Sequence, residues 1–174
     1  MQLRPIIAGI HAPTTLISTF LNNLLAPIYL KVARETTFTN SCQVIMKLLK
    51  YAANGYLTPT TKFNTADVKN LYTVIPRDGG RETFMRFLQK YSKRGKIGTL
   101  SIDHVWKLAR LILEANCFVY NNKYYIQVRG GAMGSAFTQV FANIYMLEWE
   151  QDLIEHQAAH NEIYGRLFDR HSEI

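Results

Sequence analysis

Cysteine is scarce in this sequence, which excludes sites that need several thiols. The two cysteines, Cys42 and Cys117, lie far apart, and neither belongs to a Cys-x-x-Cys or Cys/His spacing of the kind that binds zinc. A framework of several disulfide bonds is excluded for the same reason. We therefore expect two buried, reduced thiols in an intracellular protein.

Long apolar runs are also missing, so the sequence predicts no membrane span. The first residues lack the basic start and the apolar run of a signal peptide. A membrane helix needs about 20 consecutive apolar residues. The apolar stretch near the start is interrupted by His11, Pro13, Asn22, Asn23 and Pro27.

Acidic residues are fewer than basic ones. Asp and Glu number 13 against 20 Lys and Arg, which gives a formal net charge of +7. This excess favours polyanionic partners such as nucleic acids, through phosphate contacts and counterion release, although many basic proteins bind no nucleic acid. The 48% of hydrophobic residues is typical of a globular chain, and the length favours one compact domain.

The spacing of apolar residues predicts several helices. Apolar side chains recur every three or four positions in five segments, and we expect helices over 14–32, 41–54, 80–95, from Ser101 onward and after Ser135. Pro27 is expected to kink or divide the first helix, because proline lacks the backbone donor and collides with the preceding turn.

Short segments of different pattern predict strands. We expect one strand over 62–68, a hairpin of 117–120 with 123–128 around Asn121-Asn122, and a last strand over 163–168. No repeat or linker interrupts this order. The sequence therefore predicts an α+β domain with a small, largely antiparallel sheet packed against helices.

Two aspartates and one loop could carry chemistry. Asp67 and Asp169 each stand near the end of an expected strand, where a buried carboxylate is costly unless it is paired, hydrogen-bonded or bound to a cation. For a single such aspartate, capping of the next turn is the commoner role. The glycine-containing loop 130–135 leads into a helix start, which favours anions, although such glycines often form only a turn.

Four segments resemble motifs of a known enzyme family. TKFNTADVKNLYTVIP, around Asp67, resembles the first catalytic motif of reverse transcriptases in the form found in Penelope-like retroelements. QVRGGAMGSAFTQVFANIYM, residues 127–146, is similar to the nucleotide-side motif of that family. LRPIIAG looks like the family's fingers segment, and YGRLFD resembles its Tyr-x-Asp-Asp hairpin. The motifs follow the family order along nearly the whole chain.

The resemblance implies the fingers and palm of a retrotransposon reverse transcriptase, which is an RNA-directed DNA polymerase. Residues 1–60 would form a fingers-like part and residues 61–174 a palm-like part of one partial domain. The family's chemistry is nucleotidyl transfer with two Mg²⁺ or Mn²⁺ ions. Its partners are deoxynucleotides and an RNA or DNA template-primer, and a nuclear location fits the family.

Individual roles follow from the matched motifs. The resemblance makes Asp67 and Asp169 catalytic metal ligands and the backbone carbonyl of Val68 an auxiliary ligand. It places the nucleotide among four further residues. Arg4 would face the triphosphate, Tyr72 would exclude a ribose 2′-hydroxyl, and Met133 with Gly134 would pack on the nascent base pair. Without the motif, Tyr72 would be a packing residue and Arg4 an ordinary surface arginine.

The last motif departs from the family pattern. Arg170 follows Asp169 where a second aspartate is expected, and Leu167 replaces the usual aromatic residue. Only five residues follow Asp169, and segments resembling a thumb or a GIY-YIG endonuclease are absent. We therefore expect little or no polymerase activity. The alternatives are a non-catalytic nucleic-acid-binding remnant that needs no metal, and a helical interaction or vestigial protein that binds neither.

Overall fold

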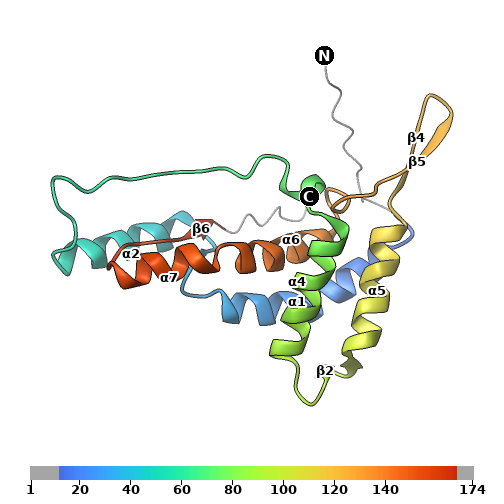
Figure 1. The fold of residues 1–174 in the computed structure, drawn as a ribbon, viewed down its shortest axis with the longest axis horizontal. Helices are drawn as coiled ribbons and strands as arrows, with labels where there is room; N and C mark the ends of the chain where they lie inside the picture. Colours follow the sequence, from blue (N-terminus) through green and yellow to red (C-terminus); the bar gives the residue numbers. More distant parts are fainter. Residues whose placement is uncertain (1–11, 168–174) are drawn as a thin grey trace. The chain divides into compact units, whose positions relative to one another are not determined.

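The computed structural model describes residues 12–167, which form two compact units. The first unit contains residues 12–29 and 69–148, and the second contains residues 30–68 and 149–167. Each unit combines helices with short paired strands, which confirms the expected α+β class (Figure 1). The division at residue 60 into fingers-like and palm-like parts stays a prediction, because the two units are interleaved along the chain.

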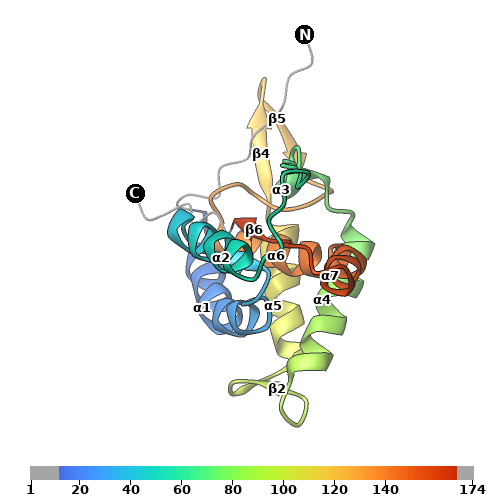
Figure 2. The same cartoon turned by 90° about the vertical axis from the view of Figure 1, so that its left-hand side faces the viewer.

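Helices that pack through one apolar face form the core of the first unit. They are α4 (Arg77–Tyr91), α5 (Ile102–Glu114), α6 (Ala136–Trp149) and the part of α1 (Thr15–Val32) that precedes Leu30. Figures 1 and 2 show α4 and α5 side by side. The Phe84 ring of α4 meets Phe137 and Phe141 of α6 edge-on, each at 5.8 Å between centroids. The spacing of three and four residues on each helix, which the sequence predicted, produces this contact.

Pro27 does not divide α1. The helix continues from Thr15 to Val32, and Leu25 and Tyr29 on either side of the proline are fully buried. Pro27 itself is exposed, and so is Asn23, whose carbonyl loses its helical hydrogen bond. Water can satisfy a carbonyl on the solvent side, so packing of the opposite face keeps the helix intact.

The first unit contains two antiparallel strand pairs. β2 (Lys96–Ile97) pairs with β3 (Leu100–Ser101), and β4 (Cys117–Tyr120) pairs with β5 (Lys123–Ile126). The β4–β5 turn is the expected one, with Asn121 at φ 48° and Asn122 at φ 56°. In both views this hairpin projects away from the helices of its unit.

The second unit contains α2 (Ser41–Ala53), α7 (Gln151–Ala159) and a parallel pair of β1 (Thr37–Phe38) with β6 (Arg166–Leu167). The Asn40 side chain caps α2 by accepting a hydrogen bond from the Gln43 amide at 3.0 Å. The sequence did not predict α7 as a separate helix.

In the second unit, the side chains of Glu150 and Lys47 hold β6 and the residues just before it. Arg166 and Glu150 form an ion pair at 2.9 Å, and burial raises the pKa of the Glu150 carboxyl against the opposing effect of Arg166. Lys47 donates to the carbonyls of Glu35 at 2.7 Å and Tyr164 at 3.2 Å. Burial lowers the pKa of Lys47. The contact of Lys47 with Tyr164 joins segments more than a hundred residues apart.

Three sequence-based expectations are wrong. Residues 62–68 are exposed and form no strand. No other described segment lies beside them as a partner strand for backbone hydrogen bonds. Cys42 and Cys117 are free, as expected, but exposed rather than buried. Cys42 lies on α2, which buries none of its residues, and Cys117 opens the projecting hairpin. Within residues 12–167, three separate strand pairs replace the single small sheet, and two of the three are antiparallel, as expected.

Within residues 12–167, no helix combines the length and the apolar content that crossing a membrane requires.

Two adjacent glycines of α4 give a matched test of the core. A Cβ at Gly80 would lie 2.7 Å from the Phe141 ring and 2.8 Å from the Ile75 side chain, whereas a Cβ at Gly79 would meet only Pro76 at 3.9 Å. We expect Gly80→Ala to lower the free energy of unfolding by about 1–2 kcal/mol through overpacking, measured by urea denaturation. Gly79→Ala should leave it unchanged or raise it by up to about 1 kcal/mol. Equal effects at both positions would contradict the observed packing.

Candidate nucleotide-side site

Two segments that resemble family motifs lie against each other in the first unit. α3 (Leu71–Val74) follows the first motif's aspartate, and the loop 130–135 belongs to the second motif. The Gly131 amide donates to the Tyr72 carbonyl at 2.8 Å, and the Gly130 amide donates to the Ile75 carbonyl at 2.8 Å. Main-chain hydrogen bonds thus join residues more than 50 positions apart.

Only glycine fits at the closest point of this contact. Gly130 has φ +58°, in the left-handed region, and a Cβ there would collide with the Tyr72 carbonyl oxygen. At Gly131, a Cβ would collide with the Thr138 side chain at the start of α6. The loop therefore lies directly on the α3 backbone and on the first turn of α6, with no side chain between them.

Arg77, which the sequence analysis did not identify as a site residue, supports the loop 130–135 through hydrogen bonds. Arg77 uses one terminal guanidinium nitrogen, Nη2, to donate to the carbonyls of Leu113 at 2.7 Å and Gln127 at 2.5 Å. The Gln127 side chain in turn donates from Nε2 to the Gly131 carbonyl at 3.1 Å. Burial lowers the pKa of Arg77, with the Glu114 carboxylate opposing that shift. Arg77 therefore links α5 to the strand-to-loop segment before Gly130.

The start of α6 is capped from within the protein. Ser18 on α1 accepts a hydrogen bond from the Phe137 amide at 2.9 Å and contacts the Ser135 hydroxyl at 2.9 Å. Ser135 also accepts from the Thr138 amide at 3.4 Å. The sequence suggested an anion at this helix start, but buried serine hydroxyls already use its first amides. A serine on the buried face of a helix was the signal that could have revealed this cap.

Three of the four residues expected near the nucleotide are described, and all three belong to this unit. Tyr72 is half-buried on α3, Met133 is half-buried in the loop, and Gly134 is exposed with φ +81°. The contact with Gly131 fixes the Tyr72 main chain, which limits where its ring can lie. Arg4, expected to face the triphosphate, lies outside the described residues.

Two of the three expected metal ligands lie within the described residues. Asp67 and Val68 lie in the second unit, on the irregular segment before α3, and both are exposed. Asp169 lies outside the described residues. In the part of the chain that the structure describes, no group of three or more His, Cys, Asp or Glu side chains could hold a metal ion. The described residues thus include one of the two implied carboxylates, that of Asp67.

The loop contact can be tested with two glycines of the same unit. Gly95 also has a positive φ of +73°, but a Cβ there would meet nothing within 4 Å. Gly95→Ala should therefore show backbone strain alone, a loss of about 1–2 kcal/mol in unfolding free energy. Gly130→Ala must also displace the Tyr72 carbonyl, and we expect a loss of about 3 kcal/mol or more.

Amide hydrogen exchange gives a local readout of the same substitution. The Gly131 amide should exchange faster in Gly130→Ala and at an unchanged rate in Gly95→Ala. Unchanged exchange at Gly131 in Gly130→Ala would show that the loop does not depend on this contact.

Comparison with known proteins adds no assignment: no family model, no curated protein and no solved structure matches the chain. The resemblance to reverse transcriptases thus depends on the four sequence motifs alone.

Proposed function

We propose that this chain is the fingers and palm portion of a reverse transcriptase, an RNA-directed DNA polymerase by descent, and that it has no polymerase activity by itself. The observation that carries the proposal is the main-chain contact of Tyr72 and Ile75 with Gly131 and Gly130. It joins the segment after the first motif's aspartate to the loop of the nucleotide-side motif. A fold that used these two motifs for one nucleotide would need them adjacent.

The contact also explains how Tyr72 would act as a selectivity residue. A side chain can exclude a ribose 2′-hydroxyl only if its backbone is held in place, since a mobile ring would move aside. The Tyr72 carbonyl is held by the Gly131 amide, and the missing Cβ of Gly130 permits that approach. Deoxynucleotides are therefore the proposed ligands of this surface.

Two features support the proposed lack of turnover. Arg170 places a cation where a second acidic ligand is expected in the last motif. Asp67 lies on an exposed segment that belongs to no helix or strand. Divalent cations with two catalytic roles need acidic ligands fixed by rigid elements. This chain's described residues do not provide that rigidity around Asp67.

A second candidate function is nucleic-acid binding without catalysis. The observation that favours it is the projecting β4–β5 hairpin, where Tyr124 is 85% exposed beside Lys123. Exposed aromatic rings next to cations suit stacked bases and phosphates, and the net charge of +7 has the required sign. This function needs neither Asp67 nor a metal ion.

The proposed selectivity of Tyr72 gives the first test. We expect the chain to bind dGTP more tightly than GTP, because the ring collides with the additional hydroxyl, and Tyr72→Ala to reduce that preference by about tenfold. Titration calorimetry with both nucleotides measures the difference. Tyr120→Ala, on the exposed hairpin of the same unit, is the control and should leave the preference unchanged. Equal affinities in the unsubstituted chain would argue against the proposal.

Primer extension tests the proposed inactivity, and a binding assay separates the two candidates. With Mg²⁺ or Mn²⁺ we expect no DNA synthesis above background, and robust synthesis would refute the proposed inactivity. Synthesis that survived Asp67→Asn would also exclude Asp67 as a metal ligand. In a parallel binding assay, affinity for template-primer that falls steeply with salt but ignores Mg²⁺ and Asp67→Ala would favour the binding function. Affinity that requires both would favour the polymerase ancestry.

A further inference from the structure

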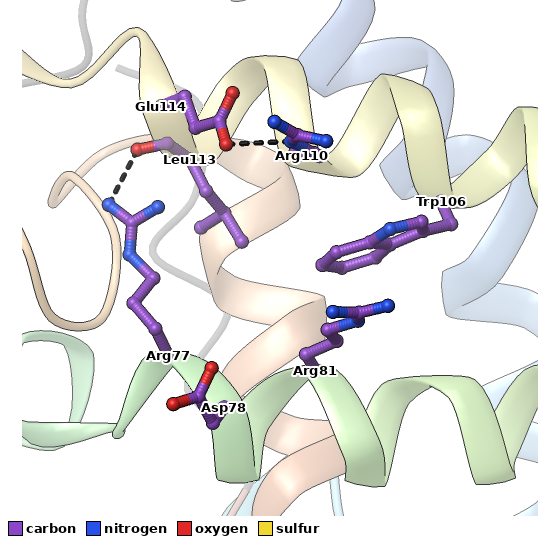
Figure 3. Close-up of a pocket in the computed structure, with 7 residues that line it drawn as sticks. All are labelled: Arg77, Asp78, Arg81, Trp106, Arg110, Leu113 and Glu114. Carbon is purple, nitrogen blue, oxygen red and sulfur yellow. Dashed lines mark hydrogen bonds and ion pairs between the residues drawn. The ribbon is translucent and has the colours of Figure 1, made fainter.

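A pocket between α4 and α5 lies apart from the glycine loop's contact with α3. Its volume is about 350 Å³, within the range of small-molecule sites. Figure 3 shows its charged and aromatic lining: Arg77, Asp78 and Arg81 come from α4, and Trp106 and Arg110 face them from α5. Residues one helical turn apart on each helix supply the two walls. All of them belong to the first unit.

The arginines of the pocket differ in what they already bind. Arg110 forms an ion pair with Glu114 at 2.7 Å, and Arg77 donates to two main-chain carbonyls. Arg81 is exposed, and no carboxylate among residues 12–167 lies within ion-pair distance of it. The guanidinium of Arg81 is thus the group of this pocket that is available to an anion.

The wall opposite Arg81 is the indole ring of Trp106. The Arg81 guanidinium lies 5.4 Å from the centre of this ring. The indole packs in turn near Phe84 of the core, at 6.3 Å between centroids, which fixes the ring's position. A flat ligand can extend this stack, because the ring face and the planar guanidinium both favour planar partners.

The charges of the lining limit the ligand's charge. Besides the three arginines, the pocket has two carboxylates, Asp78 and Glu114, so one positive side chain is in excess. Asp78 has no guanidinium or ammonium partner within ion-pair distance in the described part of the chain. Its free carboxylate would repel a second negative charge on a bound molecule. A ligand with a single negative charge matches this balance.

We propose that the pocket binds a small aromatic carboxylate, with its carboxylate on Arg81 and its ring along Trp106. A planar carboxylate can accept two parallel hydrogen bonds from one guanidinium, and conjugation keeps it nearly coplanar with its own ring. A phosphate monoester carries a charge of about −1.5 to −2 at pH 7 and is disfavoured by Asp78. This inference does not depend on the polymerase ancestry of the chain.

Benzoate is the probe, and the Trp106 indole N–H signal in a ¹H–¹⁵N spectrum of the whole chain is the readout. Saturable shifts at Trp106 are expected with benzoate, while Trp149, in the second unit, should not move. Benzamide lacks the charge and cyclohexanecarboxylate lacks the aromatic ring, so both should bind more weakly. No saturable shift at millimolar benzoate, or equal binding of all three, would overturn the proposal.

Substitutions on α4 test the roles of the two charges. Arg81→Gln should weaken benzoate binding by about tenfold or more, since it removes a charge-assisted pair. Lys90→Gln, an equal charge change at an exposed position of the same helix, is the matched control and should have no effect. Asp78→Asn should increase affinity for phenyl phosphate more than affinity for benzoate. Equal weakening by Arg81→Gln and Lys90→Gln, or equal gains in Asp78→Asn, would contradict the proposed geometry.

Discussion

The first unit depends on one close approach of main chain to main chain. Gly130 has no Cβ, so its loop can lie on the Tyr72 carbonyl, and two amide hydrogen bonds then fix α3 to the loop. Any larger residue would separate these segments and leave the buried amides without their partners, which is costly. The position of α3, the entry into α6 and the setting of Tyr72 all follow from this constraint.

Distant polar side chains complete the same arrangement. Ser18 on α1 caps α6, and Arg77 on α4 ties the end of α5 to the strand before the loop. Each of these groups satisfies backbone atoms that the glycine loop, as an irregular segment, cannot pair for itself. The serine cap also means that the start of α6 holds the fold together rather than offering its first amides to an anion.

The two proposed ligand surfaces use different chemistry within one unit. The contact of α3 with the loop presents backbone and one half-buried tyrosine, which suits discrimination by shape. The α4–α5 pocket presents an unpaired guanidinium against an indole ring, which suits a planar anion. Arg77 lies between them, since it lines the pocket while its guanidinium bonds to the carbonyl of Gln127.

Part of this structure follows from local patterns in the sequence. The apolar spacing predicted α1, α2, α4, α5 and α6, and Asn121-Asn122 predicted the hairpin, because these features depend on neighbours three or four residues away or within one turn. The predicted strand over 62–68 was wrong, because an alternating pattern of residue types does not ensure that a partner strand lies beside the segment. The predicted burial of Cys42 and Cys117 was wrong, because burial depends on which other segments cover a residue and not on its own hydrophobicity.

The sequence by itself determined five of the helices and the turn of the β4–β5 hairpin. Only the tertiary structure decided that Gly130 meets Tyr72, that Ser18 caps α6 and that Arg81 faces Trp106. These contacts join residues distant along the chain, and no local spacing encodes which of many compatible partners they meet. Shape and backbone hydrogen-bond satisfaction select those partners once the helices pack.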